Sequence, residues 1–573
     1  MKMLEDKTYK LGLALSGGGF RAGFFHIGVL SRMADIGLLR HVDLISAVSG
    51  GSIIGTLYYL RLKKLYESKK GAEVKDEDYQ NMMVEIQNDF LRAVQCNIRL
   101  RTFTNPLKNL KMCLPNYSRS DYAGELFEKF MFKPVGAFCE SKRCIYMHDL
   151  TINTTIKNAK IPKLLMNATV LKNGHNWVFT NSGMGEIDRD KSLLFVDGNF
   201  KLERVKSYQD LCKSNCHSRC EEQNKRKRGP CKHSCFRLGH AVAASASVPG
   251  VFVPLAISDL YEEGIRVQLA DGGVHDNQGI STLLSERPKC THFIISDASK
   301  QMESEKEPST HIPGVVGRSA SILADLVREK QISGHMKKYH RTTALLHLKK
   351  RLSIDSIPIK NQERQGCSFK GPYHTYGVNE EVQNLLSKVR TDLDSFSEVE
   401  AYSLMLDGYK MSEYEFKRSQ IKDLAAKSPI KPKNYRFFEI DSWLTAEEIH
   451  PYYKRLLTAS SKTLFKPFRI NRGLGNIGIL VAVFIGIMLM PNIEIPSNIS
   501  LPTVLFILPI LYVLLLKAIY TGRLRNPAIK ILFKIVPAVL IALTGFIFVN
   551  MYLLVFDKLF LYFGSMQKLK RKA

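Results

Sequence analysis

The sequence predicts an α/β fold followed by a C-terminal helical membrane region. Near the start of the chain, an apolar run of strand length at 11–15 leads into glycines at 17–19 and then into an amphipathic segment. This order is typical of a strand, a tight turn and a helix. The same order returns at 42–60, where the turn is Ser49-Gly50-Gly51. Near the other end, three apolar runs lie at 474–490, 501–516 and 535–556.

The second turn contains the predicted nucleophile. A serine at a sharp turn from strand to helix exposes its hydroxyl group, and only small neighbours allow the backbone to bend so tightly. Ser49 meets both conditions, although Ala47 stands where the G-x-S-x-G pattern has its first glycine. Two ordinary turns of a Rossmann-like or nucleotide-binding sheet are the alternative, but residues 17–23 lack the G-K-[ST] of a phosphate loop and the dinucleotide spacing.

The glycine turn predicts donors for a developing oxyanion. Consecutive glycines at the start of a helix leave backbone N–H groups that no side chain blocks, and the positive end of the helix dipole favours negative charge there. We expect the N–H groups of Gly18, Gly19 and Gly50 to serve this purpose.

A candidate base lies far downstream. The strand-like run at 267–270 ends at Asp271, which Gly272 and Gly273 follow. These flexible residues would allow the carboxylate to approach Ser49 closely. Three histidines near the same motifs are alternative bases: His26, His240 and His275.

Four segments, in this order, resemble the patatin-like phospholipase family. They are SGGGFRAG (16–23), AVSGG (47–51), SASVPGVFVPL (245–255) and ADGGVHDNQG (270–279). The resemblance spans about residues 8–300 and implies a three-layer α/β/α sandwich. It also implies a Ser-Asp dyad without histidine, in which Ser49 attacks an ester carbonyl and Asp271 takes the proton.

The resemblance assigns further residues to the site. It implies that Gly17, Gly18 and Gly19 form the oxyanion hole, and that Arg21 corresponds to the basic residue after the family's glycines. Gly51, Gly272 and Gly273 belong to the same motifs, and no cofactor is implied for catalysis. A carboxylate with a pKa near 4 is a weak base for an alcohol, but desolvation in a cleft would raise that pKa.

The composition indicates a polyanionic partner. The 573 residues include 82 basic and 54 acidic side chains, a net charge of +28. Such a surface attracts anionic lipid or nucleic acid. Because basic and aromatic residues are not interleaved as in a nucleic-acid module, while the tail is apolar, we expect an anionic lipid surface and no nucleic acid.

Three regions are expected along the chain. Residues 8–300 form the catalytic domain, 301–460 a mainly helical extension packed on it, and 474–556 a membrane region of two or three helices. Within the extension, a helix is predicted over 390–409 that ends at Gly408. Asp297 also follows an apolar run, but it lacks neighbouring glycines and is interpreted as structural. The basic segment 90–113 fits either an amphipathic lid at a membrane or a core helix.

A cysteine-rich basic insertion lies at about 205–236. Cys-x3-Cys spacing places thiolates on one helical face, so a structural metal is one hypothesis and a reduced surface insertion is the other. Disulfides are disfavoured if the domain is cytoplasmic. The candidate ligands are Cys212, Cys216, Cys220, Cys231 and Cys235.

The charges around the apolar tail predict its orientation. Basic residues precede the first run and occupy the 521–534 connector, whereas the first connector has none. The positive-inside rule then places the enzyme in the cytoplasm, in agreement with a charged N-terminus that is not a secretory signal. Three spans would leave Lys568 to Lys572 outside, so two spans with a re-entrant third segment are the alternative.

Together these features predict an integral membrane lipid acyl hydrolase. We expect it to cleave carboxylic ester bonds of phospholipids or lysophospholipids through an acyl-enzyme. A transacylase or triacylglycerol lipase would use the same site. An idle lipid-binding membrane scaffold is the alternative of another class, and the sequence does not indicate an oligomeric state.

Overall fold

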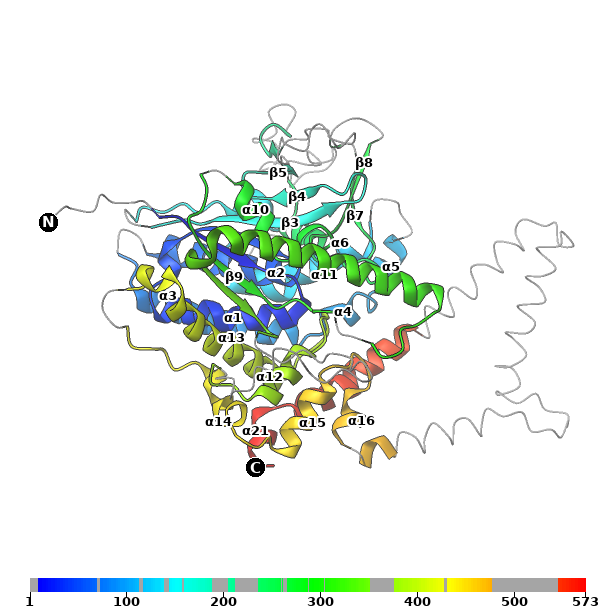
Figure 1. Ribbon diagram of the computed structural model, residues 1–573. Helices are drawn as coiled ribbons and strands as arrows, with labels where there is room; N and C mark the ends of the chain where they lie inside the picture. Colours follow the sequence, from blue (N-terminus) through cyan, green and yellow to red (C-terminus); the bar gives the residue numbers. More distant parts are fainter. Residues whose placement is uncertain are drawn as a thin grey trace, which may run out of the picture. The chain divides into compact units, whose positions relative to one another are not determined.

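The structure of the chain is a computed structural model (Figure 1). It describes residues 9–572 except for several internal segments. The gaps are 70–72, 113–116, 139–143, 157–158, 188–204, 212–234, 259, 261–264, 287, 303–304, 351–375, 427–429, 472 and 477–544. By their contacts the residues divide into two compact units, one of 1–461 with 564–573 and one of 462–563.

The described residues of the first unit form a ten-stranded sheet. Its strands are β1 (Leu11–Leu15), β2 (Val42–Val48), β3 (Lys163–Val170), β4 (Asn176–Phe179), β5 (Gly183–Glu186), β6 (Lys206–Ser207), β7 (Leu255–Ser258), β8 (Arg266–Asp271), β9 (His292–Asp297) and β10 (Thr343–His347).

The sheet has a parallel half and an antiparallel half. Strands run in the order β10-β9-β1-β2-β3-β4-β5-β6, with β10 through β3 parallel to one another. The remaining pairs are antiparallel, including β8 on β3 and β7 on β8. The segment 301–460 therefore contributes strand β10 to the sheet as well as helices.

The described helices of the first unit cover this sheet directly or pack on helices that do (Figure 1). They are α1 (Gly19–Asp35), α2 (Gly50–Ser68), α3 (Asp76–Val94), α4 (Ile98–Arg101), α5 (Pro106–Lys111), α6 (Arg119–Phe127), α8 (Leu238–Ser245), α9 (Gly273–Asp276), α10 (Ile280–Ser285), α11 (Ile312–Tyr339), α12 (Glu380–Ser387), α13 (Glu398–Arg418), α14 (Asp441–Leu444), α15 (Pro451–Ala459) and α21 (Met566–Lys570).

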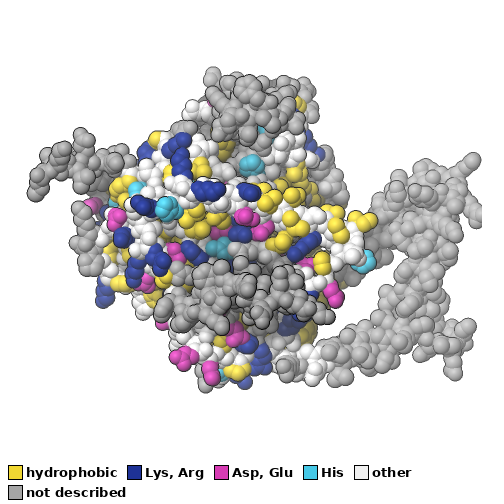
Figure 2. Space-filling view, viewed as in Figure 1, with side chains coloured by type: hydrophobic (Ala, Val, Ile, Leu, Met, Phe, Trp, Pro, Cys, Tyr) yellow, Lys and Arg dark blue, Asp and Glu magenta, His cyan; other side chains and the backbone are white. Residues whose placement is uncertain are grey.

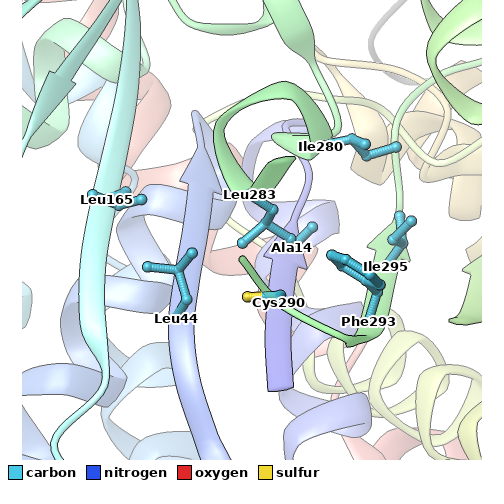
Figure 3. Close-up of a cluster of buried hydrophobic side chains, with 8 residues drawn as sticks. All are labelled: Ala14, Leu44, Leu165, Ile280, Leu283, Cys290, Phe293 and Ile295. Atoms are coloured by element: carbon cyan, nitrogen blue, oxygen red, sulfur yellow. The ribbon is translucent and has the colours of Figure 1, made fainter. Parts of the chain in front are cut away.

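Both faces of the parallel strands are buried. Helix α2 covers one face, where Gly55 lies against Leu15, Ala47 and Leu164. Alternate residues of the same strands point to the other face and pack with side chains of α10 and of the connection to β9 (Figure 3). That cluster consists of Ala14, Leu44, Leu165, Ile280, Leu283, Cys290, Phe293 and Ile295. Burial on both sides explains why these strands are continuous apolar runs.

The prediction that a helix ends at Gly408 is wrong. Ser397 caps α13 with a capping box, and the helix continues to Arg418. A Cβ atom on Gly408 would lie 2.3 Å from the Phe25 carbonyl oxygen, and one on Gly28 would lie 1.8 Å from the Met405 carbonyl oxygen. These two glycines let the backbones of α1 and α13 cross closely, so Gly408 is a packing site rather than a helix end.

The described residues of the second unit contain one helix with the length and hydropathy of a membrane span. It covers Gly545–Phe563, and 22% of its apolar window is buried. Its last part is α20 (Asp557–Phe563), which packs with α16 (Lys466–Ile470) of the same unit. Most of the length of the predicted runs lies outside the described residues, namely 477–490 of the first run, the whole of 501–516 and 535–544 of the third.

Candidate active site

The sheet register brings Ser49 and Asp271 together across 222 positions of the chain. On β3, Asn167 pairs with Val48 of β2, and the next residue, Ala168, pairs with Asp271 of β8. Strand β4 occupies the opposite edge of β3, so β2 and β8 share one edge and meet end to end. The predicted nucleophile comes directly after the β2 residue that pairs with Asn167, and the predicted base pairs with Ala168. The register on β3 therefore brings the two residues together.

Ser49 has the strained backbone of a nucleophile turn. Its φ of 50° and ψ of −117° are rare for a residue with a side chain. A Cβ atom on Gly50 would lie 2.1 Å from the Gly19 carbonyl oxygen, and one on Gly51 would lie 2.2 Å from the Leu15 carbonyl oxygen. The serine turn and the glycine turn thus touch through their backbones, which explains why both need glycine.

Asp271 faces Ser49 with one oxygen free of strong partners. Its Oδ1 accepts a hydrogen bond of 2.7 Å from the Gly273 N–H group, and Oδ2 is buried without a well-formed hydrogen bond among the described residues. Burial raises the pKa of Asp271 to about 6, although the Ser49 hydroxyl and the Gly273 N–H group act to lower it. Such a carboxylate is a stronger base than an exposed one and is still ionised at neutral pH.

A polar network holds the serine turn in place. The Ser49 N–H group donates to Ser245 Oγ at 3.0 Å, and Ser245 Oγ donates to the Asn167 carbonyl oxygen at 2.6 Å. The Asn167 side-chain amide in turn donates to Ser46 Oγ and the Ala47 carbonyl oxygen. Sequence reasoning did not assign a role to Ser245, although it begins the SASVPGVFVPL segment that carries the resemblance.

The glycine turn offers unused N–H groups. Gly18 and Gly19 have φ values of 137° and 59°, which favour glycine. None of the hydrogen bonds among the described residues uses the N–H groups of Gly18, Gly19 or Gly50. The N–H group of Gly17, in contrast, donates to the Asn277 carbonyl oxygen at 2.9 Å.

Glycines also surround the acid. A Cβ atom on Gly272 would lie 2.4 Å from the Asn167 carbonyl oxygen, and one on Gly273 would lie 2.6 Å from Asn277 Oδ1. A Cβ atom on Gly17 would also approach Asn277 Oδ1, at 2.2 Å. Asn277 thus lies between the glycine turn at 17–19 and the glycines after Asp271. The sequence of the 276–279 segment alone did not predict this position.

Arg21 joins the helix after the glycine turn to distant backbone segments through buried hydrogen bonds. Its side chain is completely buried, and its guanidinium group donates to the carbonyl oxygens of Ser387, Val389 and Ala298 at 2.7–3.0 Å. Phe20 N–H donates to the Asp392 carbonyl oxygen at 3.0 Å. The segment 387–392 therefore encloses the glycine turn, which ties the C-terminal half of the first unit to the site.

The histidines have other partners. His26 is buried, with Nε2 3.0 Å from the Ser16 carbonyl oxygen and Nδ1 2.7 Å from Ser296 Oγ. Burial lowers the pKa of His26 to about 4 and that of His240 to about 3. His240 Nδ1 lies 3.7 Å from Asp121 Oδ1. His275 is half-buried in α9. No hydrogen bond among the described residues joins these histidines to Ser49.

The cysteine insertion is largely outside the described residues. Cys212, Cys216, Cys220 and Cys231 lie there, and only Cys235 of the five candidate ligands is described. Within the described part of the chain, no group of three or more His, Cys, Asp and Glu side chains could hold a metal ion. The metal hypothesis therefore stays a prediction.

Comparison with known families agrees with this geometry. Residues 13–284 match the model of the family described as patatin-like phospholipase. The chain contains a patatin-like phospholipase domain. The match includes both Ser49 and Asp271, and it confirms the resemblance predicted from the four segments over that part of the chain.

Individual proteins match this chain either over a short segment or at low sequence identity. The Saccharomyces cerevisiae protein named "Putative meiotic phospholipase SPO1" is 47% identical over 53 residues, 9% of this chain and 8% of the yeast protein. Human GIVD cytosolic phospholipase A2 is 12% identical with a TM-score of 0.35, covering 74% of this chain and 59% of the human one. VipD from Legionella pneumophila is 10% identical with a TM-score of 0.27, covering 71% and 67%.

Proposed function

We propose that this protein is a membrane-anchored lipid acyl hydrolase that cleaves carboxylic ester bonds of phospholipids or lysophospholipids. The observation that carries the proposal is that Ser49, on a strained turn, lies beside the buried carboxylate of Asp271, whose Oδ2 has no other hydrogen-bond partner among the described residues. The patatin-like phospholipase domain supports the lipid ester as substrate class.

The reaction would proceed in two halves. Ser49 Oγ attacks the ester carbonyl while its proton passes to Asp271, and the protonated acid then gives that proton to the departing alcohol. In the second half, Asp271 takes a proton from water as the water oxygen attacks the acyl-serine, and it then gives that proton to Ser49 Oγ as the fatty acid leaves. Asp271 is the proton carrier in both halves, so no histidine is required.

The glycine turn would stabilise the tetrahedral intermediate. The unused N–H groups of Gly18, Gly19 and Gly50 lie where the two turns touch. Fixed donors of this kind are typically worth about 10²–10³ in kcat each. Gly17 would act on the shape of the turn, because its own N–H group already has a partner in Asn277.

A membrane anchor would keep the domain beside its substrate. The helix at Gly545–Phe563 and the apolar runs before it support integral membrane attachment, and the basic connector supports a cytoplasmic domain. Resistance to extraction at alkaline pH, together with protease accessibility of the domain from the cytoplasmic side only, is the expected result.

A fluorophosphonate probe tests the chemistry directly. Purified full-length protein should react with the probe, and peptide mapping should locate the label on Ser49. Ser49→Ala should lose both labelling and hydrolysis of a short-chain ester. Label on another serine, or hydrolysis that survives Ser49→Ala, would overturn the assignment.

Ser31→Ala is a matched control for that experiment. Ser31 lies in the C-terminal half of α1 and is buried, and its hydroxyl group has no hydrogen-bond partner in the described part of the chain. Removing it should leave labelling and turnover unchanged. Radiolabelled phospholipid with and without an acceptor alcohol would distinguish a hydrolase from a transacylase, because only the transacylase forms a labelled acceptor ester.

A further inference from the structure

Helix α11 carries an apolar stripe that the protein does not bury. Its N-terminal half has large apolar side chains at spacings of three and four residues, and their exposed fractions lie between 39% and 79%. At 100° per residue they occupy an arc of about 140° on one side of the helix. They are Ile312, Val315, Val316, Ile322, Leu323, Leu326 and Val327.

The stripe points away from the body of the first unit. The C-terminal half of α11 packs on the sheet through His335 and Tyr339, whose rings lie 4.7 and 4.9 Å from the ring of Phe293. By helical geometry these packing residues are on the side opposite to the stripe. In a space-filling view, hydrophobic side chains follow the course of α11 on the surface, with Lys and Arg among them (Figure 2). An ordinary surface helix has the reverse arrangement.

The stripe extends past the edge of the sheet that holds Ser49 and Asp271. Phe293 is at the start of β9, so the packed end of α11 lies at the amino ends of the parallel strands. The helix has 28 residues, about 42 Å at 1.5 Å each, whereas the neighbouring strands β9 and β10 have six and five residues. Its N-terminal half therefore projects beyond the carboxyl ends of the strands. Helix α11 also contacts α9, which begins two residues after Asp271.

A second exposed apolar group lies at the same edge. Val251 and Val253 follow the segment whose Ser247 carbonyl oxygen accepts from the Asp271 N–H group, and both are exposed. The Val253 carbonyl oxygen accepts from Ser120 of α6. Helix α5 buries none of its residues, and Leu107 and Leu110 on it are exposed.

The charged residues of the segment around the α5 patch are all basic, because 98–112 contains four basic and no acidic residues. Residues 312–329 of α11 are balanced, with Arg318 and Arg328 against Asp325 and Glu329. The chain as a whole has a net charge of +28. Exposed apolar side chains on a basic chain, with the basic segment 98–112 at one of the patches, suit the headgroup region of an anionic bilayer, which is apolar below and negative above.

We propose that the exposed stripe of α11 inserts into the surface of an anionic bilayer and holds the Ser49–Asp271 edge against it. The partner is lipid, and the helix would lie in the plane of the interface with its stripe among the acyl chains. This inference rests on the proposed function for its purpose, since a lipid substrate would enter the site from that surface. The insertion itself can be measured without catalysis.

Tryptophan quenching tests the insertion. The chain has only two tryptophans, so full-length Leu323→Trp in vesicles of phosphatidylcholine and phosphatidylserine adds one measurable signal. Brominated acyl chains should quench that signal strongly. Ser321→Trp, an exposed position on the opposite side of the same helix, is the matched control and should be quenched little. Equal quenching of the two variants, or none, would overturn the proposal.

Introducing charge on the stripe tests whether insertion supports hydrolysis of membrane lipid. Val316→Asp with Leu323→Asp should lower hydrolysis of vesicle phospholipid about 10-fold or more, because charges on the stripe oppose insertion. Ser321→Asp with Ala324→Asp adds the same charge to exposed positions off the stripe and should change it less than about twofold. Both pairs should hydrolyse a soluble monomeric ester at the normal rate.

The outcomes separate the two proposals. If the wild-type protein hydrolyses no ester but Leu323→Trp is quenched, the proposed function fails and the docking surface stands. Suppose instead that the wild-type protein hydrolyses the soluble ester normally. If the Val316→Asp/Leu323→Asp variant then hydrolyses vesicle phospholipid as fast as the Ser321→Asp/Ala324→Asp control, the docking surface fails. If Val316→Asp with Leu323→Asp lowers the unfolding temperature relative to the wild-type protein, the stripe is covered by protein, which also contradicts insertion.

Discussion

Two strand ends in the same sheet each carry a buried aspartate, and they are built for different purposes. Asp271 ends β8 and Asp297 ends β9, and their exposed fractions are 5% and 0%. Asp297 is fully bonded: Oδ1 accepts from the Ser299 N–H group at 2.9 Å and Oδ2 from the Gln278 amide at 3.3 Å. Oδ2 of Asp271 accepts no such bond from the described residues, and Ser49 is the side-chain donor that acts on this carboxylate.

The two environments shift the pKa values in opposite directions. Burial raises the pKa of Asp271 to about 6. Burial also acts to raise the pKa of Asp297, but the charge of His347 and the hydrogen bonds from Ser299 outweigh it and place the pKa below its ordinary value. The comparison shows that burial alone does not make a base. The acid also needs an oxygen that faces the serine hydroxyl group and has no other partner among the described residues.

The largest expected effect separates the two acids by activity. Asp271→Asn should lower kcat/KM by about 10³–10⁴, because the proton acceptor for Ser49 is lost. Asp297→Asn should retain activity within about 10-fold, since it faces no reacting group. Steady-state hydrolysis of a soluble ester measures both, and a comparable loss in the two variants would remove the distinction between them.

The next effect separates them by stability. Asp297→Asn should lower the free energy of unfolding by about 3 kcal/mol at pH 7, because a bonded, buried charge is replaced by an amide with mismatched donors. The pKa of Asp297 is depressed in the folded state, so this contribution is present above the unfolded pKa. It should vanish as the pH falls through the lower folded value. Denaturant unfolding at several pH values would reveal a pH-independent loss if the charge is unimportant.

Asp271→Asn should show the reverse sign. The pKa of Asp271 is raised from 3.8 to about 6 in the folded state, so ionising this acid opposes folding at neutral pH. Removing the charge should stabilise the protein at pH 8 by up to about 3 kcal/mol. The gain should shrink as the pH falls from 6 to 4 and be absent below 4. A destabilised Asp271→Asn variant at pH 8 would show that the charge has partners the geometry lacks.

The smallest effect is a pH profile. The value of kcat/KM should rise about tenfold per pH unit up to about 6 and then level off, since only ionised Asp271 accepts the proton. Asp297→Asn should have the same midpoint, because the titrating group is unchanged. A midpoint near 4 in the wild-type protein would indicate that Asp271 is solvated in solution, and one near 7 would favour a histidine.

The local features of the site were predictable from the sequence. A strand, a turn of small residues and a helix are encoded within a dozen neighbouring positions, so Ser49, Gly50 and the 17–19 turn could be recognised directly. The strained φ of Ser49 agrees with that reading. Asp271 was found because glycines follow it, whereas Asp297 lacks them.

Features that depend on distant contacts were not predictable in the same way. Gly408 looked like a helix end, but its role is to let α13 cross α1 at Phe25. The stripe of α11 has an ordinary helical period in the sequence. Only the packing of Phe293 against His335 shows that its apolar side faces outward.

The sequence by itself determined the strands, the two sharp turns, the positive charge and the apolar tail, because each depends on the chemistry of neighbouring residues. Only the tertiary structure decided that Ser49 and Asp271 meet, since this follows from adjacent pairing positions on β3. It also decided which of two similar acids keeps an oxygen for Ser49 among the described residues. The Gln278 amide, 19 positions before Asp297, occupies the second oxygen of that acid, and no local pattern records this contact.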